Sequence, residues 1–132
     1  MPDMNVVAKI SIGELIDKIT ILKIKKLNIN DESKLIHVVK ELKTLLSIHK
    51  SKIDNTKEIK LLENNLMNVN KKLWIVEDKL RILENKKLFN KNFIMLARSV
   101  YKLNDKRADV KNKINLLTSS SIVEVKSYVK YK

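Results

Sequence analysis

Residue types that bind ligands collect on and beside one flank of a helical pair that the spacing predicts between residues 59 and 117. Arg107 interrupts an otherwise apolar series there, and a buried guanidinium needs a carboxylate because an unpaired buried charge is costly. Glu77 and Asp78 are its predicted partners. The favoured interpretation is an ion pair that fixes the register of the two helices. The alternative is an anion-binding pocket with aromatic walls, formed by Asn70, Trp74, Glu77, Asp78, Arg98, Tyr101, Asn104, Lys106 and Arg107.

Two apolar series with alternating spacings of three and four residues predict the helices that carry these side chains. The first consists of Ile59, Leu62, Leu66, Val69, Leu73, Val76, Leu80 and Leu83, and the second of Phe93, Leu96, Val100, Leu103, Arg107, Val110, Ile114 and Leu117. If the chain reverses near Leu88, every position of one series faces a position of the other. The pattern therefore predicts a long antiparallel helical hairpin of the coiled-coil kind, with arms about 37 Å long.

Two shorter helices are expected before the hairpin. Ser11 begins a capping box that starts a helix ending near Asn28, and Asp31 caps a second helix over residues 32–50. With a single Gly and a single Pro, the chain has little material for tight turns between strands. The sequence thus predicts one all-α domain over residues 1–132.

The packing of the shorter helices and the structure of the chain ends follow from the same patterns. We expect both shorter helices to pack on the hairpin flank that carries Trp74 and Tyr101. Apolar residues alternate over residues 6–10 and 122–129 and indicate a small terminal β-ribbon. The C-terminal segment is also compatible with a helix.

Lysine carries most of the formal net charge of +13. Of the 28 basic residues only three are Arg, the usual bidentate reader of phosphate and guanine. The second flank of the hairpin alternates lysines with apolar side chains and is interpreted as a solvated face. A dimer seam or a surface for an anionic partner are the alternatives. The basic face consists of Lys72, Lys79, Lys86, Lys102 and Lys113.

Several classes of function lack their sequence signals. The chain has no Cys, its two His residues stand apart from any spaced carboxylate cluster, and the serines at 119–121 lie in no nucleophile motif. We therefore expect no metal, no cofactor and no catalytic residue. No apolar run approaches the roughly 20 residues that span a membrane. The first residues do not resemble a signal peptide, so a cytoplasmic protein without membrane contact is expected.

The chain resembles a family of small uncharacterised bacterial and phage-borne proteins, a domain of unknown function. The matching stretches cover most of the chain and are specific in combination: residues 10–22, Asn70, residues 73–74, 77–78, 97–101, 104–108, 122–124 and 126–128. The family pattern has an acidic residue where Lys23 stands here, so this member is more basic. The resemblance implies no established activity. Members occur near sugar or surface-polysaccharide genes, which implies at most a link to glycan metabolism.

Three functions remain open at this point. The leading prediction is a non-enzymatic module that binds a protein or an anionic ligand and self-associates, for example as a dimer. The second is nucleic-acid binding through the Lys-rich face, with affinity that falls steeply as salt rises. The third is a small helical enzyme acting on an anionic metabolite, either glycan-related or similar to the all-helical chorismate mutases. Those enzymes place Arg on their first helix, and this chain has none there.

Overall fold

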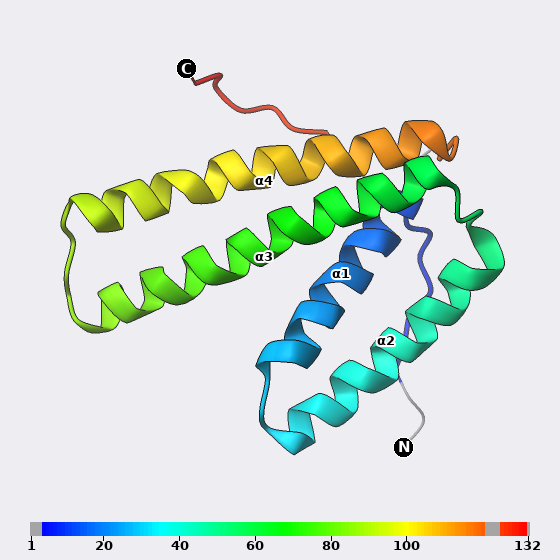
Figure 1. Cartoon of the computed structure of the whole chain (residues 1–132), viewed down its shortest axis with the longest axis horizontal. Coiled ribbons are helices and arrows are strands. Elements are labelled where there is room, and N and C mark those ends of the chain that lie inside the picture. Colours follow the sequence, from blue (N-terminus) through cyan, green and yellow to red (C-terminus); the bar gives the residue numbers. More distant parts are fainter. Residues whose placement is uncertain (1–3, 121–124, 132) are drawn as a thin grey trace.

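The computed structural model describes residues 4–120 and 125–131, and these residues form two helical pairs (Figure 1). The helices are α1 (Ile12–Asn28), α2 (Glu32–Lys52), α3 (Lys57–Asn85) and α4 (Lys91–Leu117). α1 and α2 form the shorter pair, and α3 and α4 form the long antiparallel hairpin (Figure 1). The prediction of an all-α fold with a long hairpin and two shorter helices is confirmed.

Short polar side chains determine where each helix begins. Ser11, Asp31, Thr56 and Asn90 are the four N-caps, and each side chain accepts a hydrogen bond from a backbone amide in the first turn. These bonds satisfy amides that have no partner inside the helix. The predicted caps Ser11 and Asp31 are therefore confirmed, and the predicted boundaries of the helices agree with the structure to within a few residues.

The core lies where α1 crosses the half of the hairpin that contains the beginning of α3 and the end of α4. Ile16, Leu66 and Ile114, from three different helices, are almost completely buried there. α2 contributes Val38 and Leu42 to the same cluster, and it packs mainly on α1. Burying an aliphatic side chain of this size contributes about 1.5–3 kcal/mol, so this three-helix junction supplies much of the stability.

The opposite end of the hairpin extends beyond α1 and α2 (Figure 1). Its apolar seam is covered only by the two helices themselves, so the seam residues Val76, Leu80 and Val100 are half-buried. We call residues 75–101 the projecting end. Seven of its large hydrophobic side chains are exposed, namely Ile75, Ile82, Leu88, Phe89, Ile94, Met95 and Tyr101.

The prediction that both shorter helices pack on the hairpin flank is wrong for α2. α1 covers the part of that flank near Trp74, whereas α2 packs on the far side of α1 and reaches α3 through a contact between His49 and Glu63. The physical reason is that the narrow apolar stripe of α2 is already used by α1. Tyr101 is accordingly left without cover from either helix and is exposed.

The predicted terminal ribbon is not formed by the described parts of the two ends, because residues 4–10 and 125–131 contain no strand. Residues 122–124, which belonged to the predicted strand, lie outside the described residues. The described tail contacts α4 instead. Lys126 Nζ lies 3.3 Å from Asp105 Oδ1, and the Tyr131 ring packs edge-on against Tyr101 with centroids 5.1 Å apart. These side-chain contacts replace strand pairing.

Candidate functional site

A buried carboxylate on α1 is the centre of the polar contacts between α1 and the hairpin. Asp17 has an exposed fraction of 0%. Arg107 on α4 donates two hydrogen bonds to this carboxylate, from Nε to Oδ1 at 2.9 Å and from Nη2 to Oδ2 at 2.5 Å. Asn70 on α3 donates to the same Oδ1 at 2.9 Å and to the hydroxyl of Thr20 at 2.8 Å. Asp17 therefore joins three helices through charge-assisted hydrogen bonds.

A second set of polar contacts continues this arrangement toward the beginning of α1. Lys111 Nζ lies 2.7 Å from Glu14 Oε2, and Asn115 Oδ1 accepts a hydrogen bond from the Gly13 amide at 2.7 Å. A Cβ at Gly13 would lie 2.5 Å from the carbonyl oxygen of Lys111, so only glycine permits this approach of α1 to α4. We call Gly13, Glu14, Asp17, Thr20, Asn70, Arg107, Lys111 and Asn115 the polar junction.

The polar junction changes the interpretation of Arg107. A carboxylate partner was predicted correctly, but the predicted partners Glu77 and Asp78 are wrong, because Asp17 occupies the guanidinium. The ion pair consequently fixes α1 on the hairpin. Asp17 was not among the partners predicted for Arg107 from the sequence. The signal that could have identified it is its position among Leu15, Ile16 and Ile19, where a carboxylate must be buried and must find a cation.

A cavity of about 350 Å³ opens beside the polar junction, between residues of α1 and α3. The two helices diverge from each other in Figure 1. Apolar side chains line its inner part, and Trp74 forms one wall. Glu77, Asp78 and Arg81 also line it, about two to three helical turns from Asn70 on the same face of α3. The full lining is Ile21, Ile24, Asn70, Leu73, Trp74, Glu77, Asp78, Arg81 and Arg107.

The structure brings five of the nine predicted ligand-binding residues to this cavity: Asn70, Trp74, Glu77, Asp78 and Arg107. The other four lie elsewhere. Tyr101 packs on Tyr131, and the backbone carbonyl of Asn104 accepts a hydrogen bond from Lys126 at 3.4 Å, so both positions contact the tail. Arg98 and Lys106 are exposed. Arg81 lines the cavity and was missing from the prediction.

The predicted basic face is largely open to solvent. Lys72, Lys79, Lys86 and Lys113 are exposed and Lys102 is half-buried. Within the described part of the chain, none of these five lysines forms an ion pair. Their charges are therefore available to an anionic partner.

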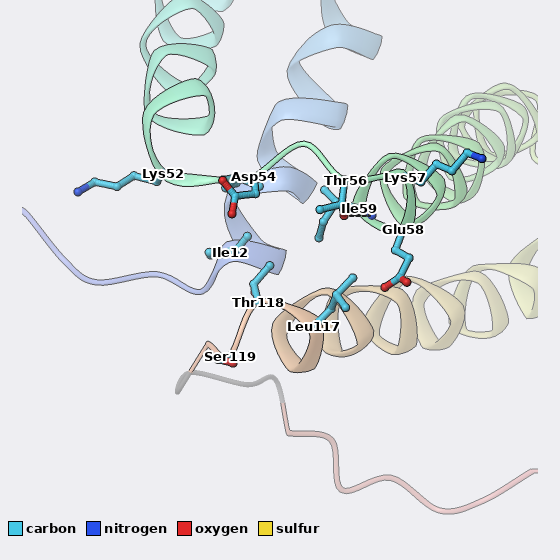
Figure 2. Close-up of a pocket in the computed structure, with 11 residues that line it drawn as sticks. Ile12, Lys52, Asp54, Thr56, Lys57, Glu58, Ile59, Leu117, Thr118 and Ser119 are labelled. Carbon is cyan, nitrogen blue, oxygen red and sulfur yellow. Dashed lines mark hydrogen bonds between the residues drawn. The ribbon is translucent and has the colours of Figure 1, made fainter.

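A second, larger cavity of about 480 Å³ lies between the connection that precedes α3 and the end of α4 (Figure 2). Lys52 and Lys57 belong to its lining, and their side chains extend away from it in Figure 2. Thr56, in the same lining, uses its hydroxyl to cap α3. The carboxylates of Asp54 and Glu58 also belong to its lining.

Comparison with known proteins identifies the family. The profile of a family of unknown function, DUF6165, matches residues 4–131. The chain belongs to this family. The resemblance inferred from its sequence stretches is thereby confirmed. No curated protein and no solved structure matches this DUF6165 chain.

Two further structural facts concern the function of this DUF6165 chain. Among residues 4–120 and 125–131, no helix is long and apolar enough to cross a membrane. The same residues contain no group of three His, Cys, Asp or Glu side chains arranged to hold a metal ion.

Proposed function

We propose that this DUF6165 chain is a non-enzymatic interaction module whose projecting end binds an acidic, amphipathic helix of a partner protein. The observation that carries the proposal is the exposure of large apolar side chains at the projecting end, which neither α1 nor α2 covers. Met95 is 68% exposed and Ile82 is 54% exposed, although the polar junction and the core beside it are closely packed. Contiguous exposed apolar residues typically mark a protein interaction site.

The charge of the projecting end indicates the chemistry of the partner. Lys79 and Lys86 lie on the same flank as Ile75 and Ile82 and are exposed without an ion pair among the described residues. An amphipathic helix with acidic residues beside its apolar stripe would bury the isoleucines and pair with the lysines. A second copy of the same flank would place lysine against lysine, and this repulsion disfavours self-association through this surface.

The buried position of Asp17 bears on the enzymatic alternative. A small-molecule enzyme was considered because Arg107 could bind an anion. Arg107 is instead engaged by Asp17 through two hydrogen bonds, so its charge is already neutralised. The interaction module does not depend on that charge.

A designed peptide pair tests the proposal. One peptide is an amphipathic helix with Leu on its apolar face and Glu beside it, and its control carries Lys in place of Glu. We expect the acidic peptide to bind in fluorescence-anisotropy titrations and the basic control to show no binding. The double variant I82S/M95S should weaken binding about tenfold or more, since it removes two apolar contacts. The matched control I36S changes an exposed isoleucine on α2 and should leave the affinity unchanged.

Other results would contradict this proposal and support a different partner. A concentration-dependent dimer in sedimentation experiments that I82S/M95S dissociates would favour self-association. Nucleic acid would be favoured if short duplex DNA bound with a steep salt dependence that I82S/M95S left unchanged, because phosphate contacts come from lysines.

A further inference from the structure

The cavity beside Trp74 is lined by charges of the opposite sign to that of the whole protein. The chain has a formal net charge of +13, yet Glu77 and Asp78 both reach this cavity and neither forms an ion pair among the described residues. Two cations line the cavity, Arg81 and Arg107. The charge of Arg107 is neutralised by its ion pair with Asp17, so Arg81 is the remaining positive charge of the lining. The local balance is therefore negative.

The buried side chain of Asn70 adds a third acceptor. Its Nδ2 donates to Asp17 Oδ1 and to Thr20 Oγ1, and a carboxylate can only accept, so the orientation of the amide is fixed. Asn70 is 5% exposed and lines the cavity, and its Oδ1 accepts no hydrogen bond from the described residues. No buried side-chain oxygen of the described residues lacks a partner, so this Oδ1 is accessible and can accept a hydrogen bond from a donor that enters the cavity.

The remaining lining is apolar. Ile21, Ile24 and Leu73 form it together with the indole of Trp74. An aromatic face next to carboxylates is a favourable environment for an organic cation, through cation–π attraction and burial of its alkyl part. A volume of about 350 Å³ is enough for a small ligand of this kind.

We propose that this cavity is a binding site for a small organic cation, with an ammonium group between Asn70, Glu77 and Asp78 and an alkyl chain against Trp74. The site lies between α1 and α3, away from the lysine-bearing flank of the projecting end, and does not depend on the proposed function. Arg81 opposes binding because it carries the same positive charge as the ligand. It lies about one helical turn from the two carboxylates, on the same face of α3.

Trp74 is the only tryptophan of the chain and therefore reports on this site directly. The probes are n-hexylammonium, its neutral isostere 1-hexanol and its anionic counterpart hexanoate. We titrate each into the full-length protein at about 0.15 M salt, where the Debye length of about 8 Å screens distant lysines. We expect a saturable change in tryptophan emission with n-hexylammonium, a weaker response with 1-hexanol and none with hexanoate.

Matched variants give the proposal its sharpest test. E77Q/D78N should weaken n-hexylammonium binding about tenfold or more, because charge-assisted hydrogen bonds are lost. R81Q should strengthen it, an opposite effect that a merely structural role of the helix would not produce. E84Q is the control, because Glu84 lies on the same helix, outside the cavity, and should bind the probe like the parent protein.

Three outcomes would overturn the cation site. A response to hexanoate in place of n-hexylammonium would show that Arg81 and Arg107 form an anion site. Equal binding of 1-hexanol and n-hexylammonium would show an apolar cavity without charge recognition. Absence of a saturable response up to about 50 mM, above the millimolar Kd expected for so small a ligand, would show that the cavity binds none of them.

Discussion

Removal of the Arg107 guanidinium should be among the most destabilising single changes on the hairpin. The variant R107M keeps much of the length of the side chain but leaves Asp17 without its bidentate partner. The Asp17 side chain is 1% exposed, so solvent cannot replace the lost contacts unless α1 separates from α4. Breaking a buried pair by removing one partner costs about 3–5 kcal/mol.

The reverse variant should cost less. In D17N the guanidinium of Arg107, whose side chain is 29% exposed, can turn toward water, and the new amide still accepts from Asn70. We expect a loss of about 1.5–3 kcal/mol, the range for hydrogen bonds to charged groups. The double variant should be more stable than the sum of the two single losses implies, because a contact can be lost only once.

Urea denaturation followed by circular dichroism at 222 nm measures these free energies of unfolding. For a chain of this length, the loss in R107M corresponds to a fall in the melting temperature of roughly 10–18 °C. The matched control is R98M, since Arg98 is exposed on the same helix and forms no ion pair among the described residues, so its effect should stay within about 0.5 kcal/mol.

Two results would refute this reasoning. One is an R107M loss no larger than that of R98M, which would mean that the ion pair contributes nothing. The other is strict additivity of R107M and D17N in the double variant, which would mean that the two side chains do not interact. High salt gives an independent check, because a buried pair is screened much less than a surface pair and the R107M deficit should persist.

Three other predictions concern the packing and the tail. G13A should cost about 1–3 kcal/mol in urea denaturation, since its new methyl carbon would lie 2.5 Å from a backbone oxygen of α4 and push the helices apart. L66A should cost about 2–5 kcal/mol and L80A clearly less in the same assay, because Leu66 is 0% exposed whereas Leu80 on the projecting end is half-buried. The hydrogen bond between the Tyr131 hydroxyl and Asp105 lowers the pKa of Asp105 from its ordinary 3.8 and raises that of Tyr131 from 10.0. Tail docking is thus favoured between these values, is lost as pH falls through the lowered pKa of Asp105 and is lost again as pH rises through the raised pKa of Tyr131. Amide chemical shifts of residues 125–131 should follow both transitions, and unchanged shifts would disprove the contact.

Local patterns in the sequence were sufficient to predict the helices and their pairing into a hairpin. Caps such as Ser11 and Asp31 act within one turn, and the heptad spacing of Leu66 and Ile114 needs only neighbouring helices to be interpreted. The half-buried seam of the projecting end was not predictable in this way. Heptad spacing shows which residues face each other and carries no information about whether a third helix covers them.

The candidate site was predicted in part because three of its residues repeat on one face of α3. Asn70, Trp74 and Glu77 share this face whatever else packs on it. The position of α1 depends instead on contacts between distant residues, above all the pair formed by Asp17 and Arg107. The periodicity within each helix does not show where the two helices cross. The local sequence therefore indicated that Arg107 needs a carboxylate, but it did not identify Asp17 as that carboxylate.

The long separations within the polar junction also constrain when the molecule can be completed during synthesis. The hydrogen bonds from α1 span 53 residues to Asn70, 90 to Arg107 and 102 from Gly13 to Asn115. While the chain is growing, α1 can pair with α2, but the Asp17 carboxylate lacks its Arg107 partner until α4 has been synthesised as far as that residue. A product that ends before Arg107 therefore leaves the Asp17 carboxylate of α1 without this partner.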